Sequence, residues 1–331
     1  SIGPFSAVGA WLVAAHEKIG DGRYCVLRNL NSGGTGTVQL ALDLKRGLLV
    51  ATKSINVGVS DYGAFMATVE LERRREAYLR EMENVKKLGD NPYLLKIFDI
   101  VAGKHAKSIV TEYLPKGDLS KSLNDTADVY GFSYSAPAIY RRGKKTVDRL
   151  TASVAVQACL GLDFMHEHGV IHLDVKPQNI FVVSENDKLG EEKMRVKLGD
   201  FDLGNVHLGL KDSKEWAGTV GYVSPEMLTQ GKTSVGPGSD LYSLGVVLYR
   251  MSTGRQPHNG NEEDKVFRPP DEISNYHGSE KYAMDDLIMN LVNIDPIKRP
   301  NNAGEVAKEI KKMMMEQYPG IEKEFPFNLI G

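Results

Sequence analysis

The feature that most constrains the fold of this chain is a change in its hydrophobic pattern near residues 113–118. Before this point, short runs rich in β-branched and aromatic residues are separated by Gly and Asn, which is typical of strands. After it, long segments repeat their apolar residues with a helical period. Strands followed by helices in a chain of 331 residues indicate an α+β fold with two parts.

The first part is predicted to contain strands and one helix. The helix is expected at 69–88, where Tyr78, Met82 and Val85 recur on one face, and the segment 89–92 ends it with a Gly and an X-Pro pair. The strands are expected at 24–30, 36–44, 48–55, 93–101 and 108–114.

The second part is predicted to be helical, with long helices at 151–169, 239–254 and 301–320. The polar and basic stretch 123–148 is long for a connection, so we interpret it as a surface insertion. A solvated loop is the favoured interpretation, and contact of its "RRGKK" with an acidic partner is the alternative. A short helix at 6–18 is expected to be a packing extension ahead of the first strand, and the alternative is an anchor for a membrane or a partner.

Composition and charge narrow the class of protein. A net charge of −2 gives no reason to expect nucleic-acid binding or attraction to a membrane. The apolar run at 7–15 is too short to cross a bilayer. Cys25 and Cys159 do not make a disulfide framework, which favours a reducing compartment and a cytoplasmic location. Because the chain begins with Ser, an upstream targeting segment could be missing.

The stretch "IHLDVKPQNI" at 171–180 carries the first chemical signal. Pro177 prevents a regular helix, so a loop can aim Asp174, Lys176 and Asn179 at one point. Phosphoryl transfer uses these types: a carboxylate orients the attacking hydroxyl, a cation steadies the phosphate and an amide oxygen holds a metal. Asp200, at the end of a strand-like segment, would add a second hard oxygen ligand for Mg²⁺.

A Gly-rich turn gives the second signal. The segment "NSGGTGTV" at 31–38 lies between two predicted strands, and its glycines would let backbone N–H groups fold over phosphates. Gly-rich hairpins are common in proteins, so this segment by itself is weak evidence for phosphate binding. Lys53, in "VATK" on the next strand, could reach phosphate oxygens, with Glu81 of the following helix as its acidic partner. Taken alone, Lys53 would be interpreted as a surface charge.

Together these motifs resemble the eukaryotic protein kinase family from about residue 23 to 316. The Gly-rich turn, "VATK", "HLDVKPQN", "DFD", "SPE", "SDLYSLG" and "DPIKRP" follow the family's order and spacing. The resemblance implies a bilobal α+β fold after an N-terminal extension at 1–22. The β-rich N-lobe with one key helix would span 23–113, and the helical C-lobe would span 114–331.

The resemblance also implies roles for individual residues. Asp174 would be the catalytic base, Lys176 would contact the γ-phosphate, and Thr219 would brace the catalytic Asp. Lys53 and Glu81 would form the ion pair that holds the α- and β-phosphates.

The implied cofactors are ATP and Mg²⁺, with Asn179 and Asp200 as the metal ligands. Thr111 would be the gatekeeper, and Asp118 would meet the ribose. The residues expected to contact the nucleotide are Asn31, Ser32, Gly33, Gly34, Gly36, Val38, Ala51, Lys53, Thr111, Glu112, Tyr113, Leu114, Asp118 and Phe181.

Other matched residues would be structural. Glu226 and Arg299 would form a buried ion pair, and Asp240 would pin the backbone of the catalytic loop. A hydrophobic spine would consist of Val85, Ile97, His172 and Phe201.

Three positions depart from the family's pattern. Asn31 replaces the first Gly of the turn, and Asp202 replaces the Gly of "DFG". Leu173 replaces the Arg that pairs with a phosphorylated activation loop, so activation through that latch is not expected. The catalytic segment is locally similar to Wee-type kinases, whereas "GTVGYVSPEM" is closer to ordinary serine/threonine kinases.

The expected function is that of a serine/threonine kinase that phosphorylates a protein substrate. The alternative is a pseudokinase with weak or no catalysis that acts as a regulator or scaffold. A small-molecule kinase of similar fold is a third interpretation.

Overall fold

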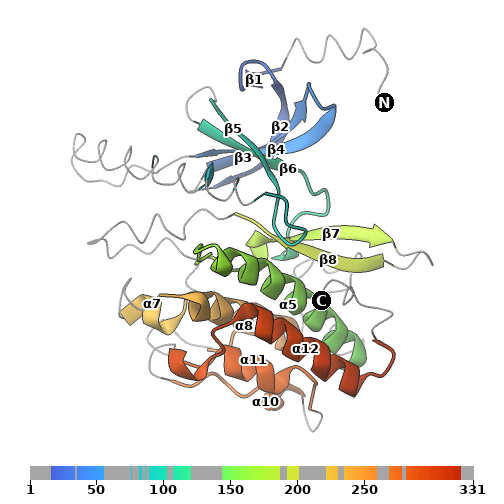
Figure 1. Ribbon diagram of the computed structural model, residues 1–331, viewed down its shortest axis with the longest axis vertical. Helices are drawn as coiled ribbons and strands as arrows, with labels where there is room; N and C mark the ends of the chain where they lie inside the picture. The colour runs from blue at the N-terminus through green and yellow to red at the C-terminus, as the bar shows by residue number, and fades with distance from the viewer. Residues whose placement is uncertain are drawn as a thin grey trace. The chain divides into compact units, whose positions relative to one another are not determined.

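The structure of the protein is a computed structural model, and its chain divides into two compact units (Figure 1). Unit 1 comprises 1–91 and 95–115, and unit 2 comprises 92–94 and 116–331. The residues described are 16–33, 36–55, 76, 82–83, 86, 89–102, 107–120, 144–186, 192–200, 221–229, 235–258, 268–277 and 281–321.

Within its described residues, unit 1 is built on an antiparallel sheet with the strand order β1-β2-β3-β4-β6-β5. The strands are β1 (Lys18–Ile19), β2 (Tyr24–Gly33), β3 (Gly36–Asp43), β4 (Leu48–Ile55), β5 (Ile97–Ala102) and β6 (Lys107–Glu112). The predicted strands are confirmed to within a few residues, with one exception. The strand expected from residue 93 begins only at Ile97, because Leu94 instead bridges to Leu198 in unit 2.

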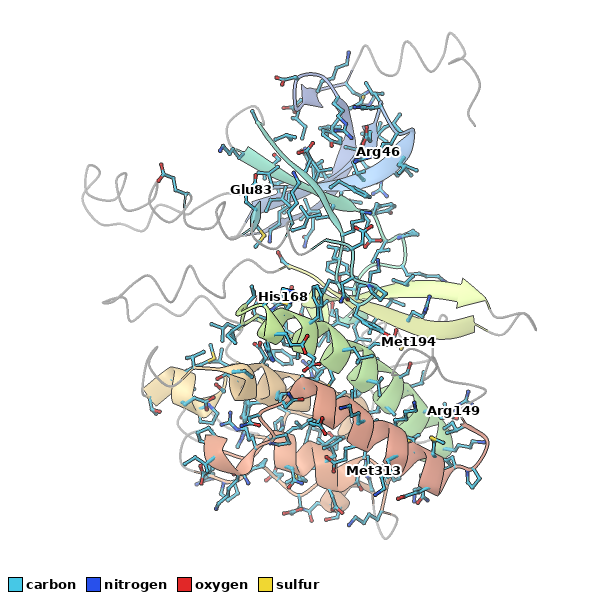
Figure 2. The ribbon with its side chains drawn as sticks, in the orientation of Figure 1. Arg46, Glu83, Arg149, His168, Met194 and Met313 are labelled. Carbon is cyan, nitrogen blue, oxygen red and sulfur yellow. The ribbon has the colours of Figure 1, made fainter. Side chains whose placement is uncertain are left out.

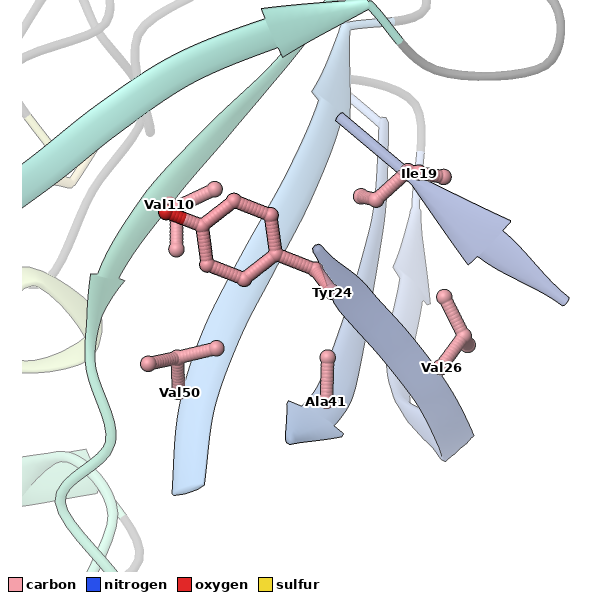
Figure 3. Packing of buried hydrophobic residues seen from close by; sticks show 6 residues of the cluster. All are labelled: Ile19, Tyr24, Val26, Ala41, Val50 and Val110. Carbon is pink, nitrogen blue, oxygen red and sulfur yellow. The ribbon is translucent and has the colours of Figure 1, made fainter. Parts of the chain in front are cut away.

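One face of this sheet forms the core of unit 1. The buried side chains of this cluster come from five strands and pack together over the sheet (Figure 3). Tyr24 lies among them with no exposed area, and its hydroxyl donates a hydrogen bond to Asp99 at 3.3 Å. The cluster consists of Ile19, Tyr24, Val26, Ala41, Val50 and Val110.

Two arginines connect strands at one end of the sheet. Arg46, labelled in Figure 2, follows β3; its guanidinium lies 3.2 Å from Asp43 and stacks over the Phe98 ring. Arg23 bonds the buried Asp43 carboxylate at 2.8 Å and lies 3.3 Å from Asp99. These contacts tie β2, β3 and β5 together at one end.

The two predicted helices of unit 1 fall largely outside the described residues. Of 69–88, the four described positions (76, 82, 83 and 86) are helical. Lys86 lies 3.3 Å from Asp99, which links this segment to β5. The helix expected at 6–18 is wrong at its end, because Lys18 belongs to β1, where backbone pairing with Cys25 overrides the helical pattern.

Unit 2 is built around helix α5 (Lys144–Glu167), which packs against α8 and α12 on one side and β8 on another (Figure 1). Its other described elements are η1 (Pro177–Asn179), β7 (Ile180–Asn186), β8 (Glu192–Leu198), α7 (Pro225–Thr229), α8 (Pro237–Thr253), α10 (Ser274–His277), α11 (Asp285–Leu291), η3 (Pro296–Lys298) and α12 (Ala303–Gln317).

The predicted helices of unit 2 are present, with shifted ends. Helix α5 begins seven residues before the predicted position 151, so 144–148 belong to a helix and not to the predicted insertion. The hydrophobic pattern did not predict the start of α5, because the Lys, Thr and Asp residues there break the apolar period. The rest of the insertion, 121–143, lies outside the described residues.

Buried polar side chains hold β8 on α5. Gln157 of α5 donates from Nε2 to the carbonyl of Met194 at 3.1 Å and accepts from the N–H of Val196 at 3.0 Å (Met194 is labelled in Figure 2). Because these bonds satisfy buried backbone groups, they fix the register between the helix and the β7–β8 hairpin. Among the helices that the structure describes, none combines the length and apolar character needed to span a membrane.

Candidate active site

The register of the unit 1 sheet places the predicted nucleotide residues on one face. Val38 of β3 is paired with Lys53 of β4, and Ala51 is paired with Thr111 of β6. Paired residues in an antiparallel sheet point to the same face, and so do residues two apart along a strand. Val38, Ala51, Lys53 and Thr111 therefore share the face opposite the core of unit 1, and all four are half-buried.

The Gly-rich turn keeps part of its predicted geometry. Gly36 has a φ of 146°, a conformation that residues with a Cβ avoid, so this glycine is required by the turn. Asn31 is exposed and paired with Val38, and its side-chain oxygen accepts the N–H of Ser32 at 2.9 Å. Gly33 is paired with Gly36, while Gly34 lies outside the described residues.

The segment predicted as the hinge follows directly from β6. The N–H of Glu112 donates to the Lys96 carbonyl at 3.0 Å, and the Glu112 carboxylate accepts the Lys96 N–H at 2.8 Å. Glu112 is thus held by the sheet through both backbone and side chain. Tyr113 and Leu114 follow the end of the strand and are half-buried.

In unit 2 the structure brings together the three predicted residues of the catalytic loop. Asn179 Nδ2 donates to both the side-chain Oδ2 and the main-chain oxygen of Asp174, each at 2.8 Å. Lys176 Nζ lies 2.7 Å from the same Oδ2. The Asp174 carboxylate is 7% exposed and is therefore held between an amide and a cation in a nearly buried loop.

Asp240, near the start of α8, anchors this loop as the resemblance implied. Its two carboxylate oxygens accept the backbone N–H groups of His172 at 2.8 Å and Leu173 at 2.7 Å. His166 of α5, which sequence reasoning missed, adds a contact of 2.8 Å to the same carboxylate. The sequence held no clear signal for this contact, because His166 is one of several polar residues on α5.

Burial sets the charge state of the candidate base. Removal from water raises the pKa of Asp174 above its ordinary value, because the charged form loses hydration. The Lys176 cation and the hydrogen bond from Asn179 oppose this effect without cancelling it. The result is a carboxylate that accepts a proton more readily than a surface aspartate, which suits a general base.

The two predicted metal ligands lie at the same end of the β7–β8 hairpin. Asn179 directly precedes β7 and Asp200 follows β8, and the Gly199 N–H donates to the Asn179 carbonyl at 2.9 Å. Asp200 has a left-handed φ of 60°, which turns the chain sharply after the strand.

An amide oxygen and a carboxylate fit Mg²⁺, which usually takes one or two protein ligands and completes its shell with phosphates and water. Among the described residues, no group of three His, Cys, Asp or Glu is placed to bind a metal by itself. Asn179 and Asp200 therefore fit the short list of protein ligands that Mg²⁺ takes.

Two further predicted nucleotide residues lie next to each other in unit 2. Asp118 forms a β-bridge with Phe181 of β7, and the Gly117 carbonyl accepts the Val182 N–H at 2.9 Å. The Asp118 carboxylate accepts the Ser120 N–H at 3.0 Å, so it also caps the start of the helical residues 119–120.

The predicted structural ion pair forms in the interior of unit 2. Arg299 donates to the two carboxylate oxygens of Glu226 at 2.9 and 2.7 Å, and both side chains are almost fully buried. Burial alone would raise the pKa of Glu226, but the hydrogen bonds and charge of Arg299 outweigh it and hold the pKa below its ordinary value. Ser239 adds a bond to Glu226 at 2.8 Å, and the Arg299 guanidinium stacks over Tyr242.

Several predicted residues lie outside the described residues: Gly34, Glu81, Val85, Phe201, Asp202 and Thr219. Of the predicted spine, Ile97 lies on β5 and is half-buried, whereas His172 is 1% exposed and its Nδ1 accepts the Asp174 N–H at 3.3 Å.

Comparison with known proteins supplies the family. A model described as the protein kinase domain matches residues 24–317. The 3-phosphoinositide-dependent protein kinase B of Dictyostelium discoideum is 27% identical over 282 residues, which cover 83% of this chain and 27% of that protein. The serine/threonine-protein kinase 17A of Oryctolagus cuniculus is 25% identical over 265 residues, covering 78% and 61%. The chain thus spans less than two thirds of the length of these relatives.

Solved structures agree on the fold. A double mutant of the PknI kinase domain of Mycobacterium tuberculosis superimposes with a TM-score of 0.61 at 18% identity, covering 88% of this chain and 95% of that one. Rad53 in complex with AMP-PNP gives a TM-score of 0.60 at 20% identity, with 86% and 64% covered. The predicted α+β kinase-like fold is confirmed, and the chain belongs to the protein kinase domain family.

Proposed function

We propose that the protein is a serine/threonine protein kinase that transfers the γ-phosphate of ATP to a hydroxyl group of a protein substrate. The observation that carries this proposal is the Asp174 carboxylate, held 2.8 Å from Asn179 and 2.7 Å from Lys176 on a loop anchored by Asp240. Names of curated relatives such as serine/threonine-protein kinase 17A support the choice of acceptor.

The residues of unit 2 act on the reacting groups. Asp174 accepts a hydrogen bond from the substrate hydroxyl and orients its oxygen toward the γ-phosphorus. It takes up the hydroxyl proton as the new oxygen–phosphorus bond forms and the bond from that phosphorus to the β–γ bridging oxygen breaks, which releases ADP. Lys176 moves from its contact with Asp174 toward the γ-phosphate, which frees the carboxylate to accept that proton. Asn179 and Asp200 hold Mg²⁺, which neutralises charge on the phosphates when bound.

Residues of unit 1, together with Phe181 and Thr219 of unit 2, take the remaining roles. Val38 and Ala51 supply apolar contacts to adenine from the sheet, Phe181 supplies one from β7, and Lys53 on the same sheet face as Val38 bonds the α- and β-phosphates. Glu81 orients Lys53, and Thr219 braces Asp174. Because Leu173 offers no positive charge, the enzyme works without the pairing of an Arg with a phosphorylated loop.

A pseudokinase remains the second candidate, and one contact favours it. The Ser32 N–H, which belongs to the turn expected to cover the phosphates, is already donated to Asn31. If this bond persists with nucleotide bound, the turn has one fewer donor for phosphate, and nucleotide binding is weaker.

The test is transfer of radiolabelled phosphate from ATP to the protein itself and to generic protein substrates, with Mg²⁺ present. Wild-type protein should transfer phosphate, and Asp174→Asn should lower the rate by about 10²- to 10⁴-fold, the usual contribution of a general base. Lys53→Met should also lower it. Asp286→Asn, at an exposed carboxylate that pairs with Lys281, is the matched control and should retain wild-type activity.

A thermal shift measured with ATP and Mg²⁺ separates the two candidates. Transfer that depends on Asp174 supports the kinase. A thermal shift without phosphate transfer supports a nucleotide-binding pseudokinase. The absence of both a thermal shift and phosphate transfer supports a scaffold that does not bind ATP.

A further inference from the structure

Leu173, the residue before the proposed base, is held in an apolar cluster of unit 2. Its side chain is 6% exposed and packs with Val223 and Met227, which are 5% and 2% exposed. Val223 lies just before α7 and Met227 lies within it. Three half-buried residues cover this cluster: Ile171, Leu228 and Val235. The Leu173 cluster therefore joins the catalytic loop to the segment that begins α7.

The backbone at Leu173 needs such support. Its φ of 58° is left-handed, a conformation that non-glycine residues rarely adopt and that persists only when surrounding contacts compensate for the strain. One compensating contact is the hydrogen bond from the Leu173 N–H to Asp240 at 2.7 Å. The other is the side chain's burial against Val223 and Met227.

We propose that Leu173 is a positioning residue, whose apolar cluster fixes Asp174 and replaces a phosphate-dependent latch with a permanent one. This inference rests on the proposed kinase function. An arginine at this position would be a cation that needs an anionic partner, whereas the partners of Leu173 are side chains of the chain itself and are always present. The catalytic loop is thus held in place without a phosphorylated activation loop.

The distance along the chain makes the coupling direct. Asp174 is the next residue after Leu173, so a rotation about the strained Leu173 backbone would displace the carboxylate from its position between Asn179 and Lys176. A displacement of about 1 Å at a reacting group costs on the order of 100-fold in rate. Nucleotide binding involves other residues, so the effect should appear in kcat and not in the KM for ATP.

The experiment compares Leu173→Ala, Leu173→Gly and Leu173→Met in the full chain. Alanine and glycine both remove the packing, but only glycine relieves the left-handed strain. If packing positions the base, kcat should fall by about 10- to 100-fold in both variants, with the KM for ATP little changed. Methionine has a volume similar to that of leucine, so Leu173→Met should retain most of the wild-type kcat.

A second arm tests the independence from phosphorylation. Wild-type protein treated with a phosphatase, from which the phosphatase is then removed, should keep its kcat. Leu287→Ala, at a leucine of α11 that is 2% exposed and outside the cluster, controls for general loss of stability. It should lower the unfolding temperature as Leu173→Ala does and leave kcat near the wild-type value.

Amide hydrogen exchange keeps the inference testable apart from activity. Leu173→Ala should speed exchange in 171–176 and 221–229 more than Leu287→Ala does. Wild-type protein that transfers no phosphate contradicts the proposed function, and the positioning role is then decided by exchange alone. Unchanged exchange, an unchanged kcat in Leu173→Ala, or loss of activity after phosphatase treatment would each overturn the inference.

Discussion

At the scale of single residues, the Asp174 carboxylate links structure to a measurable pH dependence. Because burial raises its pKa, the acid limb of the kcat/KM profile, which reports the free enzyme, should have its midpoint above the ordinary pKa of an aspartate. Lys176→Met removes the nearby cation, so the acid limb of its kcat/KM profile should lie at still higher pH. The measurement is kcat/KM against pH for both proteins, and coincident limbs would argue against Asp174 as the titrating base.

The same shift has a consequence for stability with a definite sign. The pKa of Asp174 is higher in the folded protein than in the unfolded chain, so protonation favours the folded state. The stabilisation from this group is complete below the unfolded pKa and is lost as the pH rises through the folded pKa. The catalytic loop therefore contributes less to folding at neutral pH, where the base must be ionised.

The pKa shift of Glu226 has the opposite effect on the pH dependence of stability. Glu226→Gln leaves Arg299 buried without a carboxylate, and the free energy of unfolding at pH 7 should fall by about 3–5 kcal/mol. Because the folded pKa of Glu226 is lowered, its stabilisation is present above the unfolded pKa and is lost as the pH falls through the folded pKa. Urea unfolding should show that the free energies of unfolding of the variant and the wild type differ less at acid pH than at pH 7. Glu305→Gln, in an exposed pair with Lys308, is the control and should change little.

At the scale of elements, the packing of α8 against α11 depends on a glycine. A Cβ at Gly245 would lie 2.6 Å from the Leu291 Cβ and 3.0 Å from Val292, so no side chain fits without moving α11. Gly245→Ala should destabilise the protein by about 1–3 kcal/mol, the usual cost of overpacking.

A second glycine of the same helix provides the control. A Cβ at Gly238 would meet only the Pro300 carbonyl at 3.9 Å, an ordinary contact. Gly238→Ala should therefore be neutral or stabilising by up to about 1 kcal/mol. Equal losses of stability in the two variants in urea unfolding would contradict the packing argument.

Elements also show why sequence reasoning succeeds where it does. Strands β2, β3 and β4 were predicted to within a few residues because their segments are rich in β-branched and aromatic residues and are separated by Gly and Asn. The start of α5 was not predicted because Lys144, Lys145 and Asp148, among its first five residues, fall outside the apolar period. Asp148 is buried by contacts made elsewhere, with Tyr318 at 2.6 Å and the Ala283 N–H, and no local pattern reveals them.

At the candidate site, motif spacing identified Asp174, Lys176 and Asn179 before any geometry was known. The same reasoning missed the partners from distant segments, such as His166 beside Asp240 and Val223 beside Leu173. An absent arginine was visible in the sequence. The cluster that occupies its place was not, because apolar residues at 223 and 227 carry no chemical signature.

At the scale of the whole molecule, the boundary between the two units does not follow the chain. Pro92–Leu94 belongs to unit 2 although the residues on both sides belong to unit 1. Leu94 is 5% exposed and bridges to Leu198, and the Tyr93 carbonyl accepts the Leu198 N–H at 2.8 Å. The N-terminal third of the chain therefore supplies part of the C-terminal unit.

The division into two units predicts which elements a core substitution will destabilise. Leu94→Ala should cost about 2–5 kcal/mol, the range for removing a buried leucine side chain. Amide exchange should rise in α5 and β8 of unit 2 and stay unchanged in β2–β4 of unit 1. Val110→Ala, in the core of unit 1, should show the reverse pattern. Faster exchange in the sheet of unit 1 on substitution of Leu94 would show that the boundary is misplaced.

The bridge between Leu94 and Leu198 also sets an order of events during synthesis. The sheet of unit 1 needs no residue beyond Glu112, so it can form while the ribosome is still translating unit 2. Residues 92–94 must then wait for β8, which at about 5–20 residues per second takes several seconds to emerge. During that interval Leu94 is an exposed apolar residue on a partly folded nascent chain, and it is a natural place for a chaperone to bind.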